Sequence, residues 1–167
     1  MKIVPNILTS LRLISIPFII ILFALNKIEY SIILAFFISI TDCFDGYIAR
    51  KFDAKSDLGA KLDAIADKFF AGGLLITLSL KFPILLISFF LELIISTINI
   101  IYHFQNKNPK TIFIGKVKTC FLFCNIVLGF ISCFNLNYLL YMYIIFAISI
   151  ILQIVCIICY LLKKHLK

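Results

Sequence analysis

The chain has 167 residues, of which 63% are hydrophobic and only 14% are charged, whereas an ordinary soluble domain is roughly 45–50% apolar and about 25% charged. This composition excludes a soluble globular protein. At about 20 apolar residues per membrane crossing, the length accommodates about six helical spans and almost nothing besides. We therefore expect one all-α polytopic membrane domain over residues 1–167, a bundle of six transmembrane helices.

Six apolar runs follow one another along the chain, each long enough for a membrane helix or nearly so. A polar stretch, residues 1–12, precedes them, and we expect it to form a short interfacial segment. The six predicted helices cover Leu13–Leu25, Tyr30–Ala49, Leu62–Leu80, Ile84–Phe104, Ile112–Phe134 and Tyr138–Leu162.

The net charge of +8 would suggest nucleic acid binding in a soluble chain, but basic residues of a membrane protein gather at the cytoplasmic face. Six spans place every lysine and arginine on one side except Lys27 and Lys81. This asymmetry predicts that both termini and both longer loops are cytoplasmic. It makes the lipid bilayer, and not nucleic acid, the expected partner.

Cysteines occur in pairs three or four residues apart inside apolar runs, as at Cys120 and Cys124 or Cys156 and Cys159. A disulfide within one helix or a metal site in lipid does not suit this spacing. We expect these cysteines to act as small buried hydrophobic side chains.

Acidic residues are concentrated in one short segment. Of the 8 acidic residues, only Glu29 and Glu92 lie outside the stretch from Asp42 to Asp67. An aspartate at the bilayer centre costs roughly 2.5–3.5 kcal/mol, so buried carboxylates here need a wet or metal-filled cavity. Asp42 and Asp45 share one helical face, and so do Asp63 and Asp67.

The two helices that carry these pairs are joined by a short loop, so they run antiparallel and can bring four carboxylates together. An all-oxygen ligand set suits Mg²⁺, Mn²⁺ or Ca²⁺, and a two-metal centre clamps phosphate oxygens. A cation-transport path and a solvated helix face are the alternatives. Gly46 and Gly59 let a phosphorylated ligand approach the backbone, and Arg50 is suited to bidentate phosphate binding.

Together these residues form the motif Asp42-x2-Asp45-Gly46-x2-Ala49-Arg50-x8-Gly59-x3-Asp63-x3-Asp67. It resembles the signature of the CDP-alcohol phosphatidyltransferase family at every fixed position and spacing. The resemblance implies a membrane enzyme that transfers a phosphatidyl group from CDP-diacylglycerol to an alcohol and releases CMP. It also implies a homodimer in the bacterial cytoplasmic membrane, with the active site facing the cytoplasm.

The resemblance assigns roles to the residues of the motif. Two divalent metals, Mg²⁺ or Mn²⁺, would bind four aspartates, and the last of these, Asp67, would also be the general base that deprotonates the acceptor. The metal ligands would be Asp42, Asp45, Asp63 and Asp67, and the CDP pocket would be shaped by Gly46, Ala49, Arg50 and Gly59.

The acceptor is indicated by three further segments. Residues 5–12, 62–68 and 115–119 resemble those of bacterial phosphatidylglycerophosphate synthases, which implies sn-glycerol 3-phosphate. Lys110, Lys116 and Lys118 would bind its phosphate, unless they only set topology. The chain departs from that branch at Leu91-Glu92, where an Arg-Glu pair is usual, and at Ala64, where proline is usual.

Other functions stay open at this point. The acceptor could be phosphatidylglycerol, serine or an inositol phosphate. In a different class, the chain could be a divalent-cation carrier or an inactive membrane scaffold. His103 and Glu92 lie on the fourth predicted helix, and Glu92, deep in an apolar run, needs a partner or water.

Overall fold

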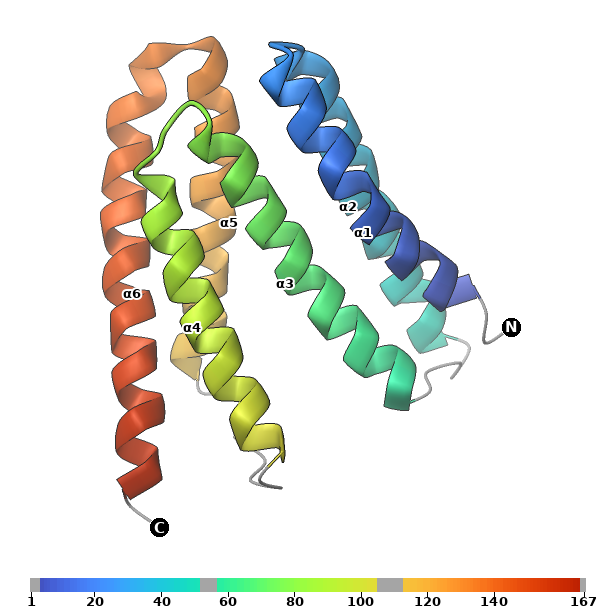
Figure 1. Cartoon of the computed structure of the whole chain (residues 1–167), viewed down its shortest axis with the longest axis vertical. Coiled ribbons are helices and arrows are strands. Elements are labelled where there is room, and N and C mark those ends of the chain that lie inside the picture. The colour runs from blue at the N-terminus through green and yellow to red at the C-terminus, as the bar shows by residue number, and fades with distance from the viewer. Residues whose placement is uncertain (1–3, 52–56, 105–112, 166–167) are drawn as a thin grey trace. The chain divides into compact units, whose positions relative to one another are not determined.

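The computed structural model describes residues 4–51, 57–104 and 113–165, with side chains for residues 10–41, 65–101 and 114–162. Within these ranges the chain is all-helical, without a strand (Figure 1). The helices are α1 (Val4–Ala24), α2 (Ile28–Lys51), α3 (Asp57–Ser79), α4 (Leu85–Phe104), α5 (Phe113–Phe134) and α6 (Leu139–His165), with a short 3₁₀ helix at Leu136–Tyr138. The prediction of six helices is confirmed.

Helix boundaries differ from the prediction mainly where polar residues continue a helix. The first helix begins at Val4, so the expected interfacial segment belongs to α1; its position relative to lipid stays a prediction. The third helix begins at Asp57 and not at Leu62. Hydrophobicity identifies the part of a helix that suits lipid, whereas backbone hydrogen bonding continues through the polar turns beyond it.

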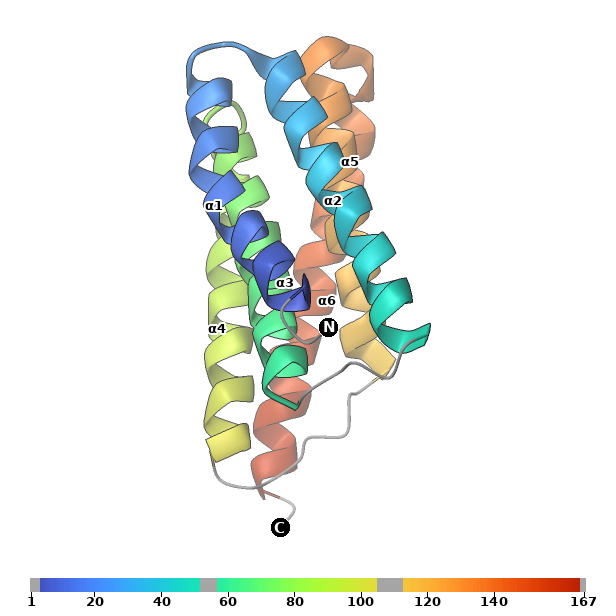
Figure 2. The same cartoon turned by 90° about the vertical axis from the view of Figure 1, so that its right-hand side faces the viewer.

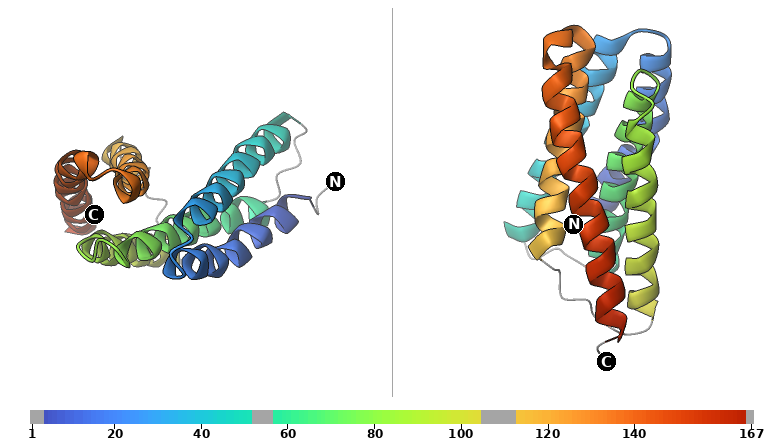
Figure 3. Two further views of the ribbon diagram at one scale, coloured as in Figure 1. Left: turned by 90° about the horizontal axis from the view of Figure 1, so that it is seen from above. Right: turned by 90° about the vertical axis from the view of Figure 1, so that its left-hand side faces the viewer.

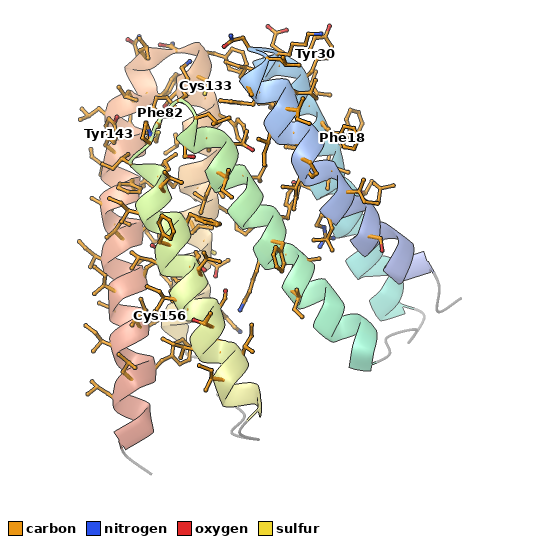
Figure 4. The ribbon with its side chains drawn as sticks, in the orientation of Figure 1. Phe18, Tyr30, Phe82, Cys133, Tyr143 and Cys156 are labelled. Atoms are coloured by element: carbon orange, nitrogen blue, oxygen red, sulfur yellow. The ribbon has the colours of Figure 1, made fainter. Side chains whose placement is uncertain are left out.

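Helices α5 and α6 are long and apolar enough to cross a membrane, over Ile114–Phe134 and Leu136–Leu162. Shorter apolar stretches among the described residues lie at Ser10–Ala24, Ile28–Thr41 and Leu85–Ile101. Large apolar side chains are exposed on several helices, including Phe18 on α1, Tyr30 on α2 and Tyr143 on α6 (Figure 4). Such surfaces suit a lipid environment better than water.

Two compact units divide the chain, Met1–Thr77 and Leu78–Lys167, and we describe each by itself. The expected single domain therefore stays a prediction. The first unit holds α1, α2 and most of α3 (Figure 2). The second holds α4, α5 and α6, which Figure 3 shows from two further directions.

The turn between α1 and α2 follows from one asparagine. Asn26 adopts a left-handed backbone with φ 59°, a conformation that asparagine tolerates better than most residues. The backbone N–H of Asn26 donates to Phe23 O at 3.0 Å, and the backbone N–H of Lys27 donates to Leu22 O at 2.9 Å. These two bonds satisfy carbonyls at the end of α1, and the chain reverses into α2.

Buried small and apolar side chains pack the first unit. Ser31 of α2 is fully buried and donates its hydroxyl to Ile19 O of α1 at 3.0 Å. Gly73 of α3 lies against Ile16 of α1: a Cβ added at Gly73 would be 2.5 Å from Ile16 Cγ2. Helices α1 and α3 therefore approach too closely at this point for any larger residue.

Gly73→Ala is expected to lower the free energy of unfolding by about 1–3 kcal/mol, the usual cost of overpacking. Ile16 cannot rotate its methyl group away cheaply, because β-branched side chains are restricted at χ1 in helices. Thermal unfolding in detergent measures the effect. Gly115→Ala is the matched control, since its Cβ would lie 4.0 Å from the Tyr160 hydroxyl, and we expect no loss there. Equal unfolding midpoints for Gly73→Ala and the unmodified protein would contradict the close approach.

Cysteines depart partly from the sequence prediction. The described cysteines are all free, as expected, and Cys156 is buried between α6 and α4 (Figure 4). Cys120 and Cys124, however, are exposed on α5. An apolar run does not reveal which of its faces meets the protein, so burial of these two thiols was wrongly predicted.

Candidate active site

The predicted metal ligands occupy two successive helices. Asp42 and Asp45 belong to the second half of α2, and Asp63 and Asp67 to the first half of α3. Figure 2 shows these helices running in opposite directions. The side chains of Asp42, Asp45 and Asp63 lie outside the part of the chain that the structure describes, so their convergence stays a prediction.

Backbone positions of the two pairs match along the helices. Asp45 precedes the end of α2 at Lys51 by six residues, and Asp63 follows the start of α3 at Asp57 by six residues. At 1.5 Å per residue, each lies about 9 Å from the connection between the helices. Asp42 and Asp67 lie at roughly 14 and 15 Å by the same reckoning. The two pairs therefore lie at similar distances from the connection, so that the antiparallel helices can bring them face to face.

The structure describes the side chain of Asp67, and a cation of α1 is one of its partners. The Arg12 guanidinium donates to Asp67 Oδ1 at 2.5 Å. The Arg12 side chain is 5% exposed, whereas that of Asp67 is 53% exposed. The contact therefore joins a buried arginine of α1 to an accessible carboxylate of α3, 55 residues away in the sequence.

In the sequence, Arg12 stands out only as one of the charges that set topology and as the last residue of the segment 5–12. The sequence did indicate that Arg12 needs a partner, because a charge at the edge of an apolar run requires one. The identity of the partner depends on how α1 packs against α3, which the spacing of residues does not reveal.

The predicted CDP-binding residues lie on the same two helices. Gly46, Ala49 and Arg50 are in the last two turns of α2, and Gly59 is in the first turn of α3. Their side-chain surroundings lie outside the described residues. Their placement on the helix ends that carry the acidic pairs agrees with a shared site, while their contacts stay a prediction.

The predicted acceptor-binding lysines belong to the second unit. Lys116 and Lys118 lie in the first two turns of α5, and Lys110 lies outside the described residues. Lys116 is exposed. Lys118 is buried and forms an ion pair with Glu92 of α4. The expectation that Glu92 needs a partner is thus confirmed.

A buried polar cluster surrounds this ion pair. Gln153 of α6 is fully buried, and its Nε2 donates to Glu92 Oε1 at 3.1 Å and to Ser88 Oγ at 2.8 Å. Ser88 Oγ also lies 3.2 Å from Gln153 Oε1. Side chains from α4, α5 and α6 therefore meet in one hydrogen-bonded group, which we call the Glu92 cluster: Ser88, Glu92, Lys118 and Gln153.

The described part of the chain is all-helical, and the backbone places Asp42 and Asp45 on one helix and Asp63 and Asp67 on a neighbouring antiparallel helix. Paired carboxylates of this kind suit phosphate chemistry with divalent cations. A model of the CDP-alcohol phosphatidyltransferase family matches residues 2–159. The chain belongs to this family.

Several relatives are similar to parts of the chain. CDP-diacylglycerol–glycerol-3-phosphate 3-phosphatidyltransferase of Rickettsia typhi is 44% identical over 84 residues, 48% of this chain and 47% of the relative. The enzyme of the same name from Wigglesworthia glossinidia brevipalpis is 46% identical over 68 residues, 39% of this chain and 37% of the relative. A cardiolipin synthase (CMP-forming) / mitochondrial hydrolase fusion protein of Schizosaccharomyces pombe is 35% identical over 112 residues, 64% of this chain and 19% of the relative.

The chain spans about half the length of the Rickettsia typhi relative and less than half of the Wigglesworthia glossinidia brevipalpis relative. The family model over residues 2–159 establishes the family, and a particular reaction is a matter of proposal.

Members of the family generally use divalent metals, and the donor chemistry of this chain fits such ions. Carboxylate oxygens are the ligands that Mg²⁺ and Mn²⁺ prefer. The Asp67 side chain accepts from Arg12 through one oxygen and is about half exposed. Among the described side chains, no three of the types His, Cys, Asp and Glu gather to hold a metal; three of the four predicted ligands lie outside that set.

Proposed function

We propose that the protein transfers a phosphatidyl group from CDP-diacylglycerol to sn-glycerol 3-phosphate and releases CMP. The observation that carries the proposal is the complete family motif between Asp42 and Asp67, with its acidic pairs at matching levels of α2 and α3. Relatives named CDP-diacylglycerol–glycerol-3-phosphate 3-phosphatidyltransferase support the choice of acceptor.

The reaction follows from the chemistry of the carboxylates. The acceptor hydroxyl attacks the phosphorus that bears the lipid, the bond from this phosphorus to the CMP oxygen breaks, and the hydroxyl proton passes to Asp67. Arg12 holds Oδ1 of Asp67 and so fixes the position of this carboxylate on α3. Gly46, Ala49, Arg50 and Gly59 would shape the CDP pocket, and Lys110 and Lys116 would attract the acceptor phosphate.

Asp42, Asp45, Asp63 and Asp67 would hold two divalent metals, Mg²⁺ or Mn²⁺. When bound, these ions would neutralise the pyrophosphate and stabilise the leaving CMP.

The proposed setting is a bilayer. All six helices would cross it, with both termini and the site on the cytoplasmic side of a bacterial membrane, and the protein would act as a homodimer. Support comes from the two helices that are long and apolar enough to span and from the apolar surfaces of α1, α2 and α4. The basic residues, gathered on one side of six spans, support the orientation.

CMP release is expected only when glycerol 3-phosphate is supplied together with CDP-diacylglycerol and Mg²⁺ or Mn²⁺. Purified protein is assayed with glycerol 3-phosphate, phosphatidylglycerol, serine and an inositol phosphate in parallel, and the lipid products are separated by thin-layer chromatography. Product with a different alcohol alone would refute the acceptor and leave the family chemistry standing.

A second acceptor is favoured by one comparison. The Schizosaccharomyces pombe relative, named a cardiolipin synthase (CMP-forming), matches a larger share of this chain than the bacterial relatives described above. Phosphatidylglycerol is therefore the alternative acceptor. A carrier or a scaffold would release no CMP with any alcohol, and metal flux into liposomes would separate these two.

A further inference from the structure

The Glu92 cluster places two opposite charges inside the α4–α5–α6 unit. The Lys118 side chain is 7% exposed and that of Glu92 is 19% exposed. Removing two ions from water costs free energy, which their mutual attraction offsets only when their geometry is good. Glu92 receives both the Lys118 ammonium and the Gln153 amide, so the charge of Lys118 is balanced within the protein.

Apolar packing closes one end of the cluster. Ile95, Cys156 and Tyr160 form a buried group. Ile95 lies three residues after Glu92 on α4, and Cys156 lies three residues after Gln153 on α6, so both are on the same helix faces as the cluster, about one turn away. The polar cluster is therefore set within a packed interface of three helices.

The rotation of α5 connects this cluster to the acceptor lysines. Lys116 and Lys118 are two residues apart, which in an α-helix separates their directions by about 200°. When Lys118 points inward to Glu92, Lys116 must point outward, and Lys116 is indeed exposed. A half turn of α5 about its axis would expose Lys118 and bury Lys116.

We propose that the Glu92 cluster is a positioning element that fixes the rotation of α5, so that Lys118 acts through Lys116 and does not itself contact the acceptor. This inference rests on the proposed function, because Lys116 is placed at the acceptor phosphate there. It divides roles between two lysines that the sequence alone could not separate.

Four variants test the proposal: Glu92→Met, Lys118→Met, the double variant of both, and Lys116→Met as the matched control. Each is assayed for its thermal unfolding midpoint in detergent and for kcat and KM toward glycerol 3-phosphate. The unfolding arm needs no substrate and so does not depend on the proposed function.

Each single change within the cluster leaves one buried charge without its partner, and we expect a midpoint lower by about 5 °C or more. The double variant removes both charges and is expected to recover at least half of that loss. Lys118→Met is expected to raise KM, and adding Glu92→Met is expected to lower KM again although Lys118 is still absent. Lys116→Met is expected to raise KM about tenfold with little change in the midpoint.

A direct contact between Lys118 and the acceptor gives the opposite result, since Glu92→Met could not then rescue KM. Failure of that rescue, or additive losses in the unfolding midpoint, would overturn the proposal. If the unmodified protein does not use glycerol 3-phosphate, the proposed function is wrong, and the unfolding midpoints alone decide about the cluster.

Discussion

Asp67→Asn is expected to reduce CMP release by about 10²–10⁴-fold, the usual contribution of a positioned general base. The amide cannot accept the proton of the acceptor hydroxyl. The rate is measured as CMP released from CDP-diacylglycerol with saturating glycerol 3-phosphate and Mg²⁺ or Mn²⁺.

Two controls separate chemistry from folding in this experiment. Asparagine keeps a side-chain oxygen for the Arg12 guanidinium, so the unfolding midpoint should change by only a few degrees. Glu29→Gln makes the same chemical change on an exposed acidic residue in the first turn of α2, and it should leave the rate unaltered. Full activity of Asp67→Asn would show that the proton goes elsewhere.

The number and order of helices could be predicted from the sequence because hydrophobicity is a local property. The end of the fourth helix at Phe104 and of the fifth at Phe134 agree with the structure. The start of α3 was placed at Leu62 and not at Asp57, because the polar residues 57–61 continue the helix without contributing to the apolar signal.

Partners of charged side chains could be predicted only in part. Glu92 lies deep in an apolar helix, so its need for a partner was evident. That the partner is Lys118, and not water or a ligand, depends on the packing of α4 against α5. The same holds for Arg12 and Asp67, whose contact joins residues 55 positions apart. Spacing along one helix defines a face, whereas the meeting of two faces depends on tertiary structure.

The contact with Arg12 gives Asp67 a structural feature that the sequence does not show. The motif makes Asp67 the last of four aspartates, and the structure adds that a buried arginine donates to it. A carboxylate fixed through one oxygen presents the other in a defined direction, which is what proton transfer to a positioned base requires.

Arg12→Met is expected to reduce CMP release by about 10–100-fold, the usual effect of removing a residue that orients a catalytic or metal-binding group. The loss should lie in kcat, since Asp67 would still be present but would no longer be held by Arg12. Arg12→Lys is expected to recover part of the rate, because lysine keeps the charge and lacks the planar pair of donors. Lys27→Met, which removes an exposed cation from the turn after α1, is the matched control and should leave the rate unaltered.

Combining Arg12→Met with Asp67→Asn tests whether Arg12 acts through Asp67. If it does, Arg12→Met should cost little further activity once Asp67 is already Asn, because residues that act as a unit are not additive. The unfolding midpoints provide an independent measure. Asp67→Ala withdraws the carboxylate from a buried guanidinium and should cost about 1.5–3 kcal/mol, and Arg12→Met in the same chain should return part of that cost. Independent, additive losses in both measurements would mean that the contact between α1 and α3 serves neither catalysis nor stability.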